Sequence, residues 1–168
     1  ESLDESADLD VLSSTRVTVV SAGVKSILDV PATLERLETL SVTVVGYETA
    51  SFPGFYLHSS GRPVDWMVRS AQEVAAIMHH QDRLGIESAL LVANPVPEDE
   101  QLDPRLHDRA LADALAGAER DEVTGQRLTP YLLDSLVRGT AGAALDANLA
   151  AVRGNVRLAA EIATAFLS

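Results

Sequence analysis

Several residue types and patterns are missing from this sequence, and each absence excludes a class of protein. There is no cysteine, which excludes a disulfide framework, a thiolate metal site and a cysteine nucleophile. No apolar run approaches the ~18 residues of a membrane-spanning helix, and no signal-like segment opens the sequence. We therefore expect a cytoplasmic protein that does not associate with membranes.

The glycine patterns of common nucleotide and hydrolase sites are missing as well. Gly-x-Gly does not occur, which excludes a dinucleotide-binding fingerprint, and neither a Walker loop nor Gly-x-Ser-x-Gly is present. The formal net charge of -12 repels phosphate backbones, so we expect no nucleic-acid partner. A small phosphorylated substrate needs only a local group of cations, backbone N–H groups or a metal ion.

Lysine is almost absent, because Lys25 is the only one among the 13 cationic side chains. A lysine, unlike an arginine, can lose its proton and attack a carbonyl carbon to form an imine. Lys25 follows an apolar run at 17–20 and the small residues Ser21, Ala22 and Gly23, which leave room for a small molecule. An ordinary surface lysine after a strand is one interpretation, and a covalent nucleophile is the hypothesis that we favour.

The order of apolar patterns predicts a three-layer α/β/α fold with a mainly parallel sheet in one domain. Continuous β-branched runs are typical of strands buried on both faces, and capping residues with first-turn prolines indicate helix starts. The expected strands cover 17–20, 42–46 and 88–93, and the expected helices cover about 29–40, 70–84, 103–119, 129–137 and 145–166. Residues 47–64 are expected to form a long loop, and loops of this length are often functional.

Two further segments contain candidate ligand-binding residues. Asp4, Glu5 and Asp8 make the N-terminal segment acidic, and carboxylate oxygens are the ligands that Mg²⁺ and Mn²⁺ prefer. A solvated acidic segment explains the same residues. Asn155 follows Gly154 in the last expected helix, where it either presents its amide to a site or is an exposed helical residue.

Short motifs follow one another along nearly the whole chain. They are residues 4–9 (DESADL), 21–29 (SAGVKSILD), 34–39 (LERLET), 46–49 (GYET), 52–56 (FPGFY), 92–97 (VANPVP), 128–133 (LTPYLL) and 155–163 (NVRLAAEIA). In this order they resemble the C-terminal half of the pseudouridine-5'-phosphate glycosidase family. The resemblance implies the α/β/α fold of that family.

The resemblance also implies an enzyme that breaks, and in reverse makes, the C–C bond between C1' of ribose 5-phosphate and C5 of uracil. It implies that Lys25 forms an imine with C1' of the opened ribose. Such chemistry suits a C–C glycosidic bond, which has no oxygen or nitrogen leaving group for two carboxylates to protonate. An iminium at C1' provides an electron sink beside the bond that breaks.

Further site residues and an assembly are implied by the same resemblance. Asp4 is expected to bind the metal, which is Mn²⁺ in the family, although Mg²⁺ accepts the same oxygen ligands. Substrate contacts are implied for Ser6, Ala7, Asp8 and Asn155. Family members are typically homotrimers, so we expect a homotrimer.

A glutamate proton donor and phosphate-binding residues are implied in an N-terminal half that this sequence lacks. We therefore expect residues 1–168 to be the C-terminal part of a single domain and to be inactive alone. Gly154 stands where the family usually has asparagine, and Gly54 where it usually has alanine, which leaves room for an aglycone bulkier than uracil if the two glycines line the base pocket. One alternative is thus a C-glycosyl synthase that joins ribose 5-phosphate to an aromatic or C-nucleoside antibiotic aglycone. An inactive binding or scaffold domain of the same fold is the other.

Overall fold

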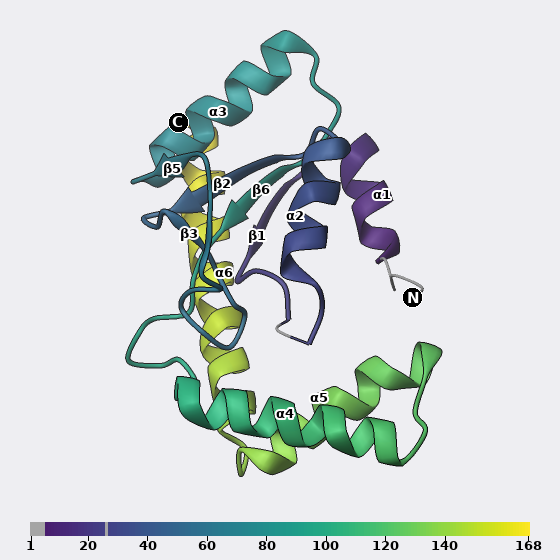
Figure 1. The fold of residues 1–168 in the computed structure, drawn as a ribbon. Helices are drawn as coiled ribbons and strands as arrows, with labels where there is room; N and C mark the ends of the chain where they lie inside the picture. The colour runs from purple at the N-terminus through teal and green to yellow at the C-terminus, as the bar shows by residue number, and fades with distance from the viewer. Residues whose placement is uncertain (1–5, 26) are drawn as a thin grey trace.

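A four-stranded parallel sheet forms the middle layer of the protein, shown in Figure 1 as a computed structural model that describes residues 6–25 and 27–168. The strands lie in the order β1 (Thr18–Ser21), β6 (Leu90–Ala93), β2 (Thr43–Tyr47) and β5 (Met67–Val68). Ser21 and Gly46 both pair with Ala93, from opposite sides of β6. The three longer strands therefore end at one level, and the segments that follow them meet at one edge.

Helices cover both faces of this sheet, which confirms the predicted three-layer arrangement. The helices α1 (Ala7–Ser14) and α2 (Val30–Thr39) cover one face, and α3 (Ala71–Leu84) and α6 (Ala143–Phe166) cover the other (Figure 1). Side chains alternate along β6: Leu91 packs towards α1 and α2, whereas Leu90 and Val92 pack towards α3 and α6. All residues of β6 are buried, as a central strand requires.

A pair of helices lies beyond the carboxyl ends of the strands. α4 (Pro104–Arg120) packs against α5 (Leu128–Gly139), which follows a short 3-10 turn, η1 (Gly125–Arg127). The fully buried Leu136 joins this pair to Tyr56 in the loop after β2 and to Ala144 at the start of α6. No helix in the part of the chain that the structure describes is long and apolar enough to cross a membrane.

The predicted starts of α2, α3 and α4 are confirmed by capping contacts, whereas α5 and α6 begin at Leu128 and Ala143 without a side-chain cap. The carboxylate of Asp29 accepts a hydrogen bond from the Ala32 N–H at 2.9 Å, ahead of α2. The Asp103 carboxylate accepts from the Leu106 N–H at 2.8 Å, ahead of α4. Ser70 caps α3, and Gly85 ends it with a φ of 67°, a left-handed conformation that glycine adopts readily.

The structure corrects two of the predictions about local structure. The predicted loop over 47–64 is not structureless, because β3 (Ser51–Phe52) and β4 (Arg62–Pro63) form an antiparallel pair within it. No helix was predicted before residue 29, yet α1 begins directly after Ser6, whose side chain accepts from the Asp8 N–H at 3.3 Å. Strands of two residues and a helix of two turns are too short to show a clear period.

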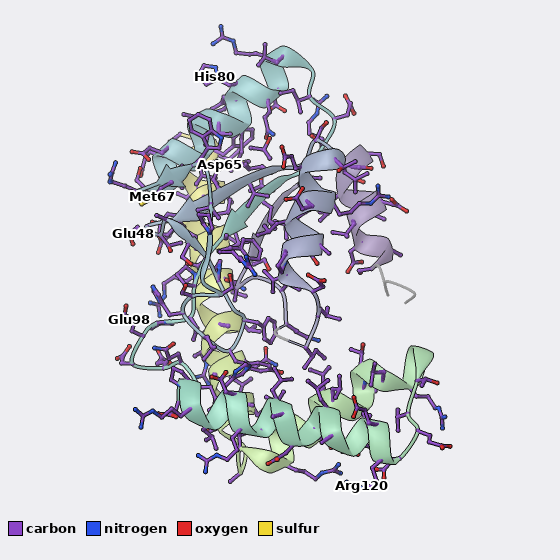
Figure 2. The ribbon with its side chains drawn as sticks, in the orientation of Figure 1. Glu48, Asp65, Met67, His80, Glu98 and Arg120 are labelled. Atoms are coloured by element: carbon purple, nitrogen blue, oxygen red, sulfur yellow. The ribbon has the colours of Figure 1, made fainter. Side chains whose placement is uncertain are left out.

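The burial of β1 also differs from the prediction. Its β-branched run predicts a strand buried on both faces, but all its residues are only half-buried, and Val17 is 42% exposed. The reason is position, since β1 is an edge strand and no described strand pairs with its outer side. The opposite edge is the short β5, whose Met67 is labelled in Figure 2.

Replacement of Leu90 by alanine should remove buried contacts between the sheet and both α3 and α6. Leu90 is 1% exposed, so we expect the free energy of unfolding to fall by about 2–5 kcal/mol, measured by urea denaturation. Leu84→Ala is the matched control, because this leucine is 74% exposed, and it should change stability by less than about 0.5 kcal/mol. Equal losses for the two variants would contradict this assignment of the core.

Candidate active site

Lys25 lies in the loop after β1, at the carboxyl edge of the sheet. Its side chain is half-buried, and its Nζ is 5.7 Å from the centroid of the Phe55 ring, within the range of a cation–π interaction. The Lys25 carbonyl oxygen accepts a hydrogen bond from the Leu28 N–H at 2.8 Å. Lys25 is therefore held against a neighbouring loop, at the sheet edge where open α/β sheets bind ligands.

A cavity of about 1230 Å³ extends from Lys25 along β1 and between α1 and α2. Ser6 and Asp8, at the start of α1, line it together with Lys25, and Thr129 and Pro130 of α5 lie on its wall. Much of the remaining wall is apolar, with Val19, Leu37, Phe52 and Leu91. The structure thus brings three of the predicted site residues to one cavity, whereas Ala7, exposed like Ser6 and Asp8, is not among the residues that line it.

The small residues before Lys25 accommodate a neighbouring loop, and Ser21 and Gly23 also line the cavity. Gly23 has a φ of 93°, and a Cβ at this position would overlap the carbonyl oxygen of Pro53. Gly23 forms an isolated bridge with Gly54, and the Phe55 N–H donates to the Ala22 carbonyl at 3.0 Å. Gly23 therefore allows the two loops to meet and also lines the cavity together with Ser21, as expected of a backbone that leaves room for a small molecule.

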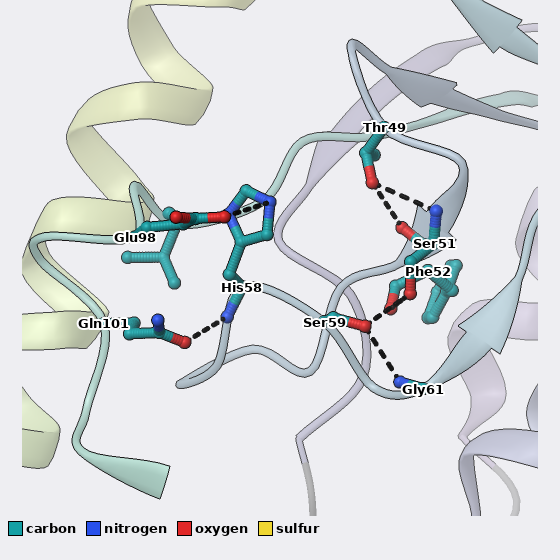
Figure 3. A network of polar contacts seen from close by, with 9 residues as sticks. Thr49, Ser51, Phe52, His58, Ser59, Gly61, Glu98 and Gln101 are labelled. Carbon is teal, nitrogen blue, oxygen red and sulfur yellow. Dashed lines mark hydrogen bonds and ion pairs between the residues drawn. The ribbon is translucent and has the colours of Figure 1, made fainter.

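The loop after β2 is fixed by its own polar network (Figure 3). Thr49 Oγ1 accepts from the Ser51 N–H at 3.0 Å, and Ser59 Oγ accepts from the Gly61 N–H at 3.0 Å. The His58 N–H donates to Gln101 Oε1 at 3.0 Å. These contacts hold residues 49–61 in the position that places Phe55 beside Lys25.

Asn155 enters the carboxyl edge from the opposite face of the sheet. It lies in α6, half-buried, and its Oδ1 accepts a hydrogen bond from Nδ2 of Asn94 at 3.0 Å. Asn155 is not among the residues that line the Lys25 cavity, so the structure does not join these two predicted site residues directly. Asn94 follows the predicted strand at 88–93 and lies in the motif at 92–97, but no site role was predicted for it. An asparagine placed between a buried strand and a proline is the pattern that could have identified it.

The described wall of the cavity has few positively charged side chains that could bind a phosphate group. Lys25 and Arg36 are the cationic residues of its described wall, against the carboxylates of Asp8, Asp29 and Glu35. Arg36 is also 3.6 Å from a carboxylate oxygen of Asp10. Recognition of a phosphate thus calls for donors beyond those of this wall.

Two tyrosines near the carboxyl edge are unsuited to act as bases. Burial raises the pKa of the Tyr56 phenol. Burial, and then the negative charges of Glu48 and Glu161, raise the pKa of the Tyr47 phenol. Both phenols therefore stay protonated at neutral pH.

The predicted metal ligand, Asp4, lies outside the described residues. Within residues 6–25 and 27–168, no three histidine, aspartate or glutamate side chains are grouped as a metal site. Among the described residues, the side-chain donors nearest to Asp4 in the chain are the Ser6 hydroxyl and the Asp8 carboxylate, which are oxygen ligands that suit Mn²⁺ or Mg²⁺. A single carboxylate, completed by water and substrate oxygens, is a common way to hold such a cation.

Relatives of known sequence agree with the resemblance carried by the motifs. A protein from Streptomyces griseus subsp. griseus named pseudouridine-5'-phosphate glycosidase is 63% identical over 166 residues, which are 98% of this chain and 51% of that protein. One of the same name from Frankia alni is 57% identical, over 99% of this chain and 46% of its own length. The chain thus spans about half the length of the curated relatives it matches.

The fold has a close match among solved structures, and a family profile covers the chain. The structure of the prealnumycin C-glycosynthase AlnA in complex with ribulose 5-phosphate matches with a TM-score of 0.91 and 31% identity, over 98% of this chain and 54% of that one. This likeness confirms the predicted fold class. The profile described as indigoidine synthase A like protein matches residues 1–165. This chain therefore belongs to the indigoidine synthase A like protein family.

Proposed function

We propose that this chain supplies the imine-forming half of an enzyme that makes or breaks the C–C glycosidic bond between ribose 5-phosphate and an aglycone. The observation that carries the proposal is the placement of the only lysine in a cavity shared with Ser6 and Asp8. The names of the relatives support cleavage of pseudouridine 5'-phosphate to uracil and ribose 5-phosphate as the reaction. The phosphosugar bound to AlnA supports a phosphorylated pentose as substrate.

The role of Lys25 is best followed in the synthetic direction. The neutral Nζ attacks the C1' aldehyde of ring-opened ribose 5-phosphate, and loss of water leaves a protonated imine. C5 of uracil then attacks C1' and gives up its proton, while the C=N electron pair returns to nitrogen. Ring closure at C1' expels the lysine amine, so the net reaction joins the two substrates and releases one water. Cleavage is the reverse sequence.

The residues near Lys25 have separate tasks in this scheme. Phe55 limits the movement of the Lys25 side chain and covers it from one side. Ser6 and Asp8 face the same cavity, where their oxygens can bind sugar hydroxyl groups. Asp4 would hold the metal, which when bound supplies positive charge for substrate oxygens. The proton donor and the phosphate ligands come, in this proposal, from the half of the relatives that this chain does not match.

Replacement of Lys25 tests the central step in a hybrid enzyme, in which this chain replaces the matching segment of the Streptomyces griseus relative. Lys25→Arg keeps the charge but cannot form an imine, so we expect release of uracil from pseudouridine 5'-phosphate to fall by roughly 10⁴-fold or more. Borohydride with ribose 5-phosphate should add one reduced pentose phosphate to the peptide that contains Lys25, measured by mass spectrometry.

Arg62→Lys is a matched control for the trapping experiment, because Arg62 is exposed in β4 and outside the cavity. The lysine introduced there should remain unmodified. An unmodified peptide around residue 25, or full turnover by the Lys25→Arg enzyme, would refute the proposed role.

Replacement of Asp4 tests the metal assignment. Asp4→Asn in the hybrid enzyme should weaken Mn²⁺ binding by at least about tenfold, measured by titration of free Mn²⁺ with electron paramagnetic resonance in the absence of substrate. Asp10→Asn is the control, since this carboxylate is 3.6 Å from Arg36 and should not alter Mn²⁺ affinity. Equal Mn²⁺ affinity in all three proteins would assign the metal to other ligands.

A second candidate, C-glycosyl synthesis on a bulkier aglycone, is favoured by Gly154. A Cβ at this position would lie 3.5 Å from Asn94 Nδ2, so the glycine leaves open space beside the two asparagines. Gly54 gives no such support, because its Cβ would face its own loop, 3.1 Å from the Ser59 carbonyl oxygen. Of the two glycines that depart from the family pattern, Gly154 alone can enlarge the site.

Gly154→Asn in the hybrid enzyme should distinguish the two reactions. If the open space accepts a large aglycone, this variant should lower kcat/KM for an aromatic polyketide aglycone with ribose 5-phosphate by roughly tenfold or more. Its turnover of pseudouridine 5'-phosphate should change far less. No product of the aromatic aglycone with the parent hybrid enzyme, measured by mass, would exclude this second candidate.

A further inference from the structure

The hydrogen bond between Asn94 and Asn155 joins two elements that are far apart in the chain. Asn94 is the first residue after the central strand β6, and Asn155 lies in α6, 61 positions later. The bond from Asn94 Nδ2 to Asn155 Oδ1 measures 3.0 Å, and both residues are half-buried. Partial burial limits competition from water, so the contact can fix the orientation of both amides.

Asn94 is a rigid support for this contact. Its N–H donates to the Ser21 carbonyl at 2.8 Å, which ties it to the end of β1. Pro95 restricts the backbone of Asn94 to extended conformations. Val96 is fully buried, and its carbonyl accepts from Nδ1 of His58 at 2.9 Å. The backbone of Asn94 is therefore fixed by contacts at Asn94 itself and at Val96, which limits the positions open to its side chain.

The hydrogen bond from Asn94 determines which end of the Asn155 amide is free to bind a ligand. An asparagine amide has one oxygen that accepts and one nitrogen that donates. Because Asn94 occupies the oxygen of Asn155 as a donor, the nitrogen of Asn155 is the group left to meet a ligand. Asn155 is thereby set to bind a hydroxyl or carbonyl oxygen rather than an N–H group.

Gly154 lies beside this contact. Asn94 Nδ2 is 3.5 Å from the position that a Cβ of residue 154 would take, which is an ordinary van der Waals distance. The amide of Asn94 therefore lies next to the backbone of α6 as well as to the side chain of Asn155.

We propose that Asn94 is a positioning residue, which orients the amide of Asn155 so that its N–H groups face an oxygen of the substrate. The inference rests on the proposed function, because it takes Asn155 to contact the substrate. The competing explanation is that the two amides only tie α6 to the sheet. The two explanations differ in whether Asn94 acts on catalysis through Asn155.

A double-mutant cycle in the hybrid enzyme separates these explanations. Asn94→Ala, Asn155→Ala and the double variant are compared by kcat and KM for pseudouridine 5'-phosphate. We expect each single change to lower kcat/KM by roughly 10–100-fold, and the double variant to be no worse than Asn155→Ala. Asn148→Ala, two turns earlier in α6, is the matched control and should remain within about twofold of the parent.

Asn94→Asp tests the direction of the hydrogen bond and does not create a cavity. A carboxylate at residue 94 can only accept, so Asn155 must turn its amide to donate, and its oxygen then faces the substrate. We expect the same loss of kcat/KM as for Asn94→Ala, with an unchanged urea midpoint. Parental kinetics for Asn94→Asp would overturn the proposal whether or not the alanine variant folds.

The outcomes also separate this proposal from the proposed function. If the parent hybrid enzyme gives no borohydride adduct at Lys25, the proposed function fails. If the adduct forms but Asn94→Ala lowers kcat/KM by the same factor with and without Asn155, Asn94 acts independently. Only the positioning role is then overturned.

Discussion

The parallel pairing of β1 and β2 on the two sides of β6 is the constraint on which the site depends. Ser21 and Gly46 both pair with Ala93, so β1, β2 and β6 end at the same level of the sheet. Lys25, Phe55 and Asn94 follow these strands, so residues from distant parts of the sequence meet at one edge. A shift of one residue in either pairing would separate them and turn the buried side chains of the strands to the wrong face.

The two faces of the sheet contribute to this edge in different ways. The face covered by α1 and α2 carries the cavity that Lys25, Ser6 and Asp8 share. The other face contributes Asn155 through the long helix α6, and Asn94 is the contact between the two sides. The described wall of the cavity offers few cations, and no described strand pairs with the outer side of β1. Both features agree with a chain that spans about half the length of its relatives.

Much of the fold could be predicted because its longer elements carry strong local patterns. β-branched runs marked β1 and β2, and an apolar run marked β6. Capping residues such as Asp29 and Ser70 marked helix starts. The sequence did not predict four short elements: the antiparallel strands β3 and β4, the strand β5 and the helix α1. They are short, and tertiary pairing rather than sequence period determines them.

The site could be predicted in part for similar reasons. Lys25 was identifiable because no other lysine competes with it, and Asn155 because a motif contains it. The role of Gly23 could not be predicted from the sequence. A side chain at this position would overlap Pro53, and that contact exists only because two loops meet in the folded protein.

That close approach has a mechanical consequence. Gly23 touches the loop after β2, and the same loop holds the segment after β6 through His58 and Gln101. A ligand that displaces the backbone before Lys25 must therefore push all three segments at once. These contacts couple the three segments, so we expect the backbone at Lys25 to resist displacement more than a single isolated loop would.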